Sequence, residues 1–98
     1  MEQSIGVAEK ARELAWTLWD PIGLSEIMGG WKGQPFEDEY DRYMSQAIKM
    51  RQHGDSIQDV VTYFLWVEID HMGLGSGRAD QNARALQLAT AVFELPLE

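Results

Sequence analysis

Glu68 is the residue of this sequence whose type and position most clearly imply chemistry. Its helical phase places it on the same side of its helix as four apolar residues, namely Ile57, Val61, Phe64 and Met72. A carboxylate on a core-facing side must be paired or hydrogen-bonded, or its pKa must rise until it binds a proton. The partners that we expect for it are Arg51, the Trp19 indole, or the hydroxyl of Tyr40 or Tyr43.

Two interpretations of Glu68 are open from the sequence. In the first, it is a satisfied buried group that fixes how the helices pack. In the second, it belongs to a pocket for a small ligand or a substrate, since a buried ionisable group beside aromatic residues often marks a site. The pocket would be lined by Trp19, Asp20, Tyr40, Arg51 and Glu68. A raised Glu68 pKa in an open pocket favours the second interpretation, and an ordinary or lowered pKa in an ion pair favours the first.

The spacing of Glu68 and His71 matches the Glu-x-x-His pattern that places two metal ligands on one helical face in di-iron bundles. Such a site needs a second Glu-x-x-His and two further glutamates, whereas the only other histidine is His53, on a different helix. We therefore predict no metal site. The sequence also has no nucleophile elbow, phosphate loop or dinucleotide fingerprint. No catalytic residue and no cofactor is predicted, and an enzyme is the less favoured hypothesis.

A predicted binding surface begins with Tyr63 and Trp66, which fall on the side of their helix that faces away from its apolar residues. Asp59 and Asp70 lie beside them on that side. Tyr and Trp at a protein surface often anchor an interface. Trp31, in a glycine-rich loop, is a further candidate for this interface. The alternative is that Tyr63 and Trp66 contact the last helix or the loop of the same chain.

The charge of the chain narrows the class of partner. The 98 residues include 8 Lys and Arg against 16 Asp and Glu, which gives a formal net charge of −8. This charge repels nucleic-acid phosphates and anionic lipid, and no basic patch offsets it, so we expect neither nucleic acid nor a membrane as a partner. Residues 55–74 contain four acids and no Lys or Arg. This segment suits a basic protein partner, and the alternative is a solvated acidic face.

Turn signals divide the sequence into four helical stretches. The predicted helices span about residues 4–19, 35–53, 56–72 and 78–94, with a glycine-rich loop at residues 20–34. Asp20-Pro21 ends the first helix, and Ser56 with Asp59 forms a capping box that begins the third. We predict an all-α fold, a compact bundle of about four helices, in a single domain over residues 1–98.

The last predicted helix has an apolar arc wider than half of its circumference. The residues of this arc are Ala85, Leu86, Leu88, Ala89, Val92 and Phe93. So wide an arc needs two neighbours, which are either the first and third helices or a second copy of the chain. Self-association is therefore a second hypothesis for the partner. The absence of cysteine and of any signal-peptide-like or membrane-length apolar run leads us to expect a cytoplasmic protein.

The sequence also resembles a family of small bacterial helical proteins of unknown function, some of which are found beside toxin genes and treated as possible immunity proteins. The matching pieces are Trp19-Asp20-Pro21-Ile22-Gly23, then Asp38-Glu39-Tyr40-Asp41 with Tyr43, then Gly54, Leu65, Glu68 and Met72-Gly73-Leu74. The resemblance implies a compact helical domain with these pieces at a common structural centre, and it implies no catalytic residue. It covers neither the loop between Gly23 and Phe36 nor the helix after Leu74.

The favoured hypothesis is a small bacterial protein-interaction module, which acts as an immunity-like or adaptor partner or as a homo-oligomer. The alternative hypothesis is a small-ligand-binding protein or an enzyme that uses the pocket around Glu68.

Overall fold

Helices form the regular structure of residues 6–96, which are the residues described by this computed structural model, and no strand occurs among them. The α-helices are α1 (Val7–Leu14), α2 (Leu24–Ile27), α3 (Asp41–His53), α4 (Ile57–Trp66) and α5 (Gln81–Glu94). Two π-helical turns, η1 (Ala15–Trp19) and η2 (Val67–His71), continue α1 and α4. Since α2 is a single turn, the prediction of an all-α bundle of about four helices is confirmed.

Local side-chain chemistry sets several helix ends where the sequence predicted them. The Ser56 hydroxyl accepts the Asp59 N–H at 3.1 Å and the Asp59 carboxylate accepts the Ser56 N–H at 3.0 Å, so the predicted capping box begins α4. Helix α3 ends at Gly54, whose φ of 101° is readily taken up only by glycine. The first helix ends at Trp19 as predicted, and its predicted start at Ser4 lies outside the described residues.

Two helix starts and one loop were predicted wrongly. The helix expected from residue 35 begins at Asp41, because tertiary bonds hold the preceding segment in turns; one of them joins the Trp16 indole N–H to the Glu37 carbonyl at 2.9 Å. The helix expected from residue 78 begins at Gln81, because Asp80 takes a left-handed φ of 59°. The loop predicted at residues 20–34 contains α2.

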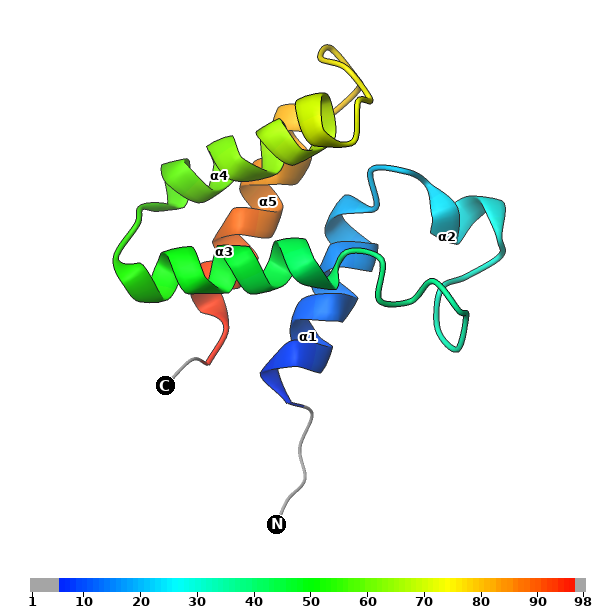
Figure 1. The fold of residues 1–98 in the computed structure, drawn as a ribbon, viewed down its shortest axis with the longest axis horizontal. Coiled ribbons are helices and arrows are strands. Elements are labelled where there is room, and N and C mark those ends of the chain that lie inside the picture. The colour runs from blue at the N-terminus through cyan, green and yellow to red at the C-terminus, as the bar shows by residue number, and fades with distance from the viewer. Residues whose placement is uncertain (1–5, 97–98) are drawn as a thin grey trace.

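Helix α5 is the central element of the bundle. It packs against α4, against α3 and against the continuous α1–η1 segment, while the α2 segment lies to one side of them (Figure 1). The Cα atoms span 44 × 34 × 18 Å, and the shortest dimension fits two layers of helices at the usual spacing of about 8–10 Å. The chain itself covers most of the predicted apolar arc of α5, whereas Leu86 is 51% exposed. A second copy is not needed to bury this arc.

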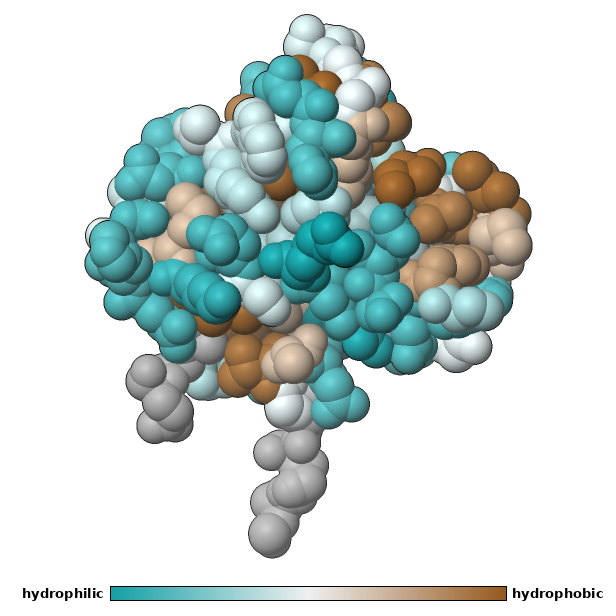
Figure 2. Space-filling model, in the orientation of Figure 1, coloured by the Kyte–Doolittle hydropathy of each residue, from teal (hydrophilic) through white to brown (hydrophobic). Residues whose placement is uncertain are grey.

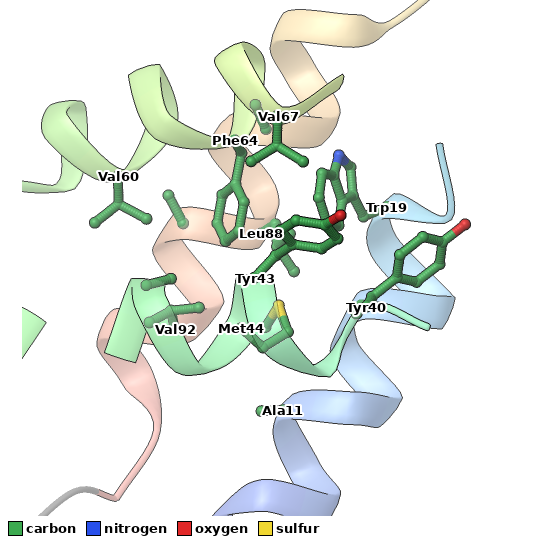
Figure 3. Packing of buried hydrophobic residues seen from close by; sticks show 14 of the residues in the cluster. Ala11, Trp19, Tyr40, Tyr43, Met44, Val60, Phe64, Val67, Leu88 and Val92 are labelled. Carbon is green, nitrogen blue, oxygen red and sulfur yellow. The ribbon is translucent and has the colours of Figure 1, made fainter. Parts of the chain in front are cut away.

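Aromatic side chains from different elements meet in the core (Figure 3). The Trp19 ring centroid lies 5.4 Å from that of Tyr40, 6.0 Å from that of Tyr43 and 5.1 Å from that of Phe64. These contacts tie η1 to α3, to the turn before it and to α4, and such aromatic pairs stabilise a core beyond the apolar area that they bury.

Candidate functional site

Glu68 is the centre of a closed polar cluster. Its side chain is 1% exposed, and its donors are Arg84 at 3.2 Å, Gln81 at 3.0 Å and Arg78 at 3.1 Å. Burial raises the pKa of Glu68, but hydrogen bonds from Gln81 and Arg84 and the charges of Arg84 and Arg78 lower it by more, so the pKa lies below its ordinary value. Glu68 is therefore an ionised carboxylate whose charge is satisfied within the chain.

The partners expected for Glu68 were wrong, although its burial was predicted correctly. Arg51 instead donates to the carbonyls of Val92 and Leu95 at 2.8 and 2.7 Å, at the C-terminal end of α5, where the helix dipole favours a cation. Glu68 is bound to residues at the opposite end of that helix. The order of elements along the chain does not reveal which end of α5 each side chain meets, because that depends on the packing of α3, α4 and α5.

A signal in the sequence could have pointed to two of the three partners, Gln81 and Arg84. Gln81 and Arg84 share the helical phase of Ala85 and Leu88, so two polar residues interrupt the apolar stripe of α5 just as Glu68 interrupts that of its own helix. When the apolar sides of two helices pack together, polar residues on these sides tend to hydrogen-bond to each other, because a buried polar group without a partner is costly in free energy.

The pH dependence of folding offers a test of this cluster. An unfolded glutamate has a pKa of about 4.3. The pKa of Glu68 is lower in the folded chain, so its contribution to the free energy of unfolding is complete above that pH and is lost as the pH falls through the folded value. We expect Glu68→Gln to weaken the loss of stability between about pH 5 and about pH 3, measured by urea unfolding. Glu94→Gln removes an exposed carboxylate as a control, and equal pH profiles for both variants would contradict the prediction.

Asp20 and Tyr40 are brought together as predicted, in a hydrogen-bonded turn between η1 and α2. The Tyr40 hydroxyl donates to the Asp20 carboxylate at 2.7 Å, and the same carboxylate accepts the N–H groups of Leu24 at 3.2 Å and Ser25 at 3.1 Å. Burial, followed by the bond to Asp20, raises the pKa of Tyr40, which stays protonated. Asp20 thus stabilises the turn that leads into α2, with its carboxylate engaged by three donors of the chain.

The five residues of the predicted pocket do not converge on one site. Trp19, Asp20 and Tyr40 form one cluster. Glu68 belongs to a second cluster, and its partner Arg78 also donates at 2.9 Å to the carbonyl of Pro21, the residue that follows Asp20. Arg51 lies at the other end of α5, and the Trp19 indole N–H has no hydrogen-bond partner among the described residues.

The Glu-x-x-His spacing does not bring Glu68 and His71 onto one face. Glu68 is buried, whereas His71 is exposed and stacks on Trp66 with ring centroids 5.3 Å apart and planes 28° apart. The π-helical turn η2 has more residues per turn than an α-helix, so residues three positions apart no longer share a face here. Within residues 6–96, no group of three or more His, Asp and Glu side chains is arranged to hold a metal ion.

The surface feature with the clearest chemical character is an open depression of about 630 Å³ along α4. We call it the acidic–aromatic depression, and it is lined by Met50, Asp55, Asp59, Thr62, Tyr63 and Trp66. Helix α4 presents Asp59, Tyr63 and Trp66 on one side because they are spaced by four and three residues. None of the six lining residues is basic, so the depression combines apolar ring surface with negative charge.

Three of the five residues predicted for a binding surface line this depression, and two do not. Asp70 is exposed but is not part of the lining, since it lies in the widened turn η2. Trp31 lies in the loop before α3 and stacks on Trp16, with centroids 5.7 Å apart and planes 4° apart. The prediction missed Met50, and it included Asp55 only as one acid of the segment 55–74, because both residues precede α4 in sequence and are brought beside it only by the α3–α4 turn.

A separate apolar patch covers the α2 segment. Figure 2 shows hydrophobic side chains gathered on that side of the molecule. The exposed members are Ile22, Ile27 and Met28, which are 37%, 72% and 52% exposed. The patch differs chemically from the acidic–aromatic depression, because its exposed side chains are all apolar. It therefore suits an apolar partner.

Comparison with known proteins does not assign the chain to a family. No protein-family model, no curated protein and no solved structure matches it. The resemblance drawn from the sequence therefore stays a prediction. Among the described residues, no helix is both long and apolar enough to cross a bilayer.

Proposed function

We propose that this chain is a small protein-interaction module that binds a basic protein partner through the acidic–aromatic depression. The observation that carries the proposal is the exposure of Trp66, 48%, next to Tyr63 and two carboxylates. Tryptophan and tyrosine are the residue types that most often dominate binding energy at interfaces. Exposing a large indole to water gains nothing for folding, so a role in binding accounts for its position better than a role in packing.

Charge supports the same proposal. The net charge of −8 steers basic partners toward the chain, and the depression holds Asp55 and Asp59 without a compensating cation in its lining. Such complementarity raises the rate of association with basic partners and disfavours the binding of acidic ones. The partner is therefore a protein with a basic surface.

The state of Glu68 argues against the ligand-binding or enzymatic alternative. Its carboxylate is ionised, buried and bonded by three side chains of the chain, so it offers neither a proton nor a free oxygen to a ligand. A general acid or base needs a pKa close to the working pH and access to the substrate. Glu68 has neither property.

We further propose that the module acts in the cytoplasm as an immunity-like or adaptor protein. The lack of cysteine fits a reducing compartment. The resemblance to toxin-neighbouring bacterial proteins motivates the immunity-like form, in which the partner is a basic toxin. The adaptor form requires only a basic segment on another protein.

Purification of the tagged full chain from its native host, at low and at high salt, tests the proposal. Mass spectrometry of the eluate should identify a basic protein at stoichiometric amount, and high salt should remove it. Trp66→Ala, and separately the pair Asp55→Asn and Asp59→Asn, should each weaken binding of the purified partner by about tenfold.

The matched control is the pair Asp38→Asn and Glu39→Gln. It removes two exposed acids outside the depression, so it changes net charge equally while leaving the lining intact. Equal loss of binding in the control would assign the effect to net charge alone. Elution without a partner under both salt conditions would overturn the proposal.

Self-association stays a second candidate because of the apolar patch over α2. Three of the five exposed large hydrophobic residues of the described chain belong to it. Light scattering of the purified chain measures this directly. A dimer that Ile27→Asp disrupts would support self-association, and a monomer at high protein concentration would exclude it.

A further inference from the structure

The two aromatic rings of the depression, Tyr63 and Trp66, continue into a row of stacked rings that includes His71. The ring centroids of Tyr63 and Trp66 lie 6.2 Å apart with planes 26° apart, and Trp66 and His71 are 5.3 Å apart with planes 28° apart. The face of an aromatic ring carries negative electrostatic potential and attracts cations. Rings with similar orientation and an exposed indole suit a flat cation better than a bulky apolar side chain.

Carboxylates stand at the edge of this ring surface. Asp59 uses one oxygen to accept the Ser56 N–H, and its other oxygen has no hydrogen-bond partner among the described residues. Asp55, whose side chain is 34% exposed, faces His53 at 3.4 Å. Both carboxylates therefore keep acceptor positions for a donor from outside the chain.

The contacts of the two α3 arginines lie outside the lining of the depression. The Arg42 guanidinium lies over the Tyr43 ring, 6.0 Å from its centroid, and Arg51 donates to the end of α5. Neither side chain lines the depression. The combination of rings and carboxylates thus has no cation from its own lining to satisfy it.

Building on the function proposed above, we propose that the acidic–aromatic depression binds an arginine side chain of the partner, with the guanidinium stacked on the exposed part of the Trp66 indole and its edge donating to Asp59 or Asp55. A guanidinium is planar, weakly hydrated on its faces and carries five donors in its plane. It can therefore stack on a ring and bond a carboxylate at the same time. A lysine ammonium is compact and strongly hydrated, and it cannot make both contacts as well.

Titration of the ¹⁵N-labelled full chain with short peptides tests this inference. The probes are acetyl-Gly-Arg-Gly-Arg-Gly-amide and the same peptide with lysine or with uncharged citrulline in place of arginine. The arginine peptide should shift the Trp66 indole N–H signal and the amide signals of the α4 lining. It should bind about threefold or more tightly than the lysine peptide, and citrulline should give no localised shifts.

Two variants locate the binding energy. Asp59→Asn keeps an oxygen that can accept the Ser56 N–H, so it removes the charge while preserving the cap of α4. Trp66→Leu removes the π surface while keeping an apolar side chain. Each variant should bind the arginine peptide about threefold or more weakly than the unchanged chain does. Asp38→Asn, outside the depression, should leave the affinity for this peptide unchanged. Retained backbone spectra show that the variants are folded.

The outcomes separate this inference from the proposed function. Equal affinity for the arginine and lysine peptides, or shifts outside the depression, would overturn the inference. A captured partner that is lost on Trp66→Ala would still support the interaction function in that case. Absence of any partner, together with absence of peptide binding, would overturn both.

Discussion

Replacing Glu68 with alanine should lower the free energy of unfolding by about 3 kcal/mol, the largest loss that we expect from a single change outside the apolar core. The substitution leaves Arg84, Gln81 and Arg78 without their shared acceptor. Gln81 is 6% exposed, so water does not readily replace the lost bond. Arg78 and Arg84 have side chains that are 38% and 22% exposed, and partial hydration keeps the loss from being larger.

Urea unfolding followed by circular dichroism measures this change. Glu68→Gln should cost about half as much as Glu68→Ala, because it keeps the volume and one acceptor oxygen while removing the charge. Glu94→Ala, on the exposed side of α5, is the control and should change stability by less than about 0.5 kcal/mol. An unchanged unfolding midpoint for Glu68→Ala would mean that the carboxylate is not a buried bonded group.

Asp20→Ala should destabilise the fold by about 2 kcal/mol, the second largest effect. It removes the acceptor of the Tyr40 hydroxyl and of the Leu24 and Ser25 N–H groups. It also places alanine at a φ of 35°, where residues with a Cβ atom other than Asn and Asp are disfavoured. Both effects act on the same turn, so the α2 segment should loosen as stability falls.

Companion variants separate these two contributions. Asp20→Asn keeps an acceptor oxygen and a residue type that tolerates the left-handed conformation, so it should cost less than about 1 kcal/mol. Tyr40→Phe removes only the hydroxyl, and a double-mutant cycle with Asp20→Ala should give a coupling of about 1 kcal/mol. Additive effects in this cycle would contradict a direct bond between Asp20 and Tyr40, and Asp38→Ala at an exposed position serves as the control.

The Glu68 cluster, the α2 patch and the acidic–aromatic depression differ in what they offer a partner. The Glu68 cluster is internally satisfied, and the α2 patch is apolar. The acidic–aromatic depression joins exposed rings to carboxylates with acceptor positions left over, and its lining contains no basic residue. This difference explains why we assign binding of a basic partner to the α4 face and stability to the Glu68 cluster.

Much of the fold was determined by the sequence alone, because the responsible forces act between neighbours in the chain. The apolar period identified the main helices. Ser56 and Asp59 specified the start of α4, and Gly54 specified the end of α3, through bonds and dihedral preferences within a few residues. The phase of Glu68 indicated burial for the same reason, since a helix fixes which residues share a face.

Only the tertiary structure decided which side chains meet. In the folded chain Glu68 is hydrogen-bonded to Arg78, Gln81 and Arg84 rather than to Arg51, and Asp55 lines the depression together with Tyr63. The physical reason is that such pairings depend on which end of α5 lies against each helix and on the π-helical turns η1 and η2. These features arise from the packing of the whole core around Trp19 and Phe64, which no local pattern of residues encodes.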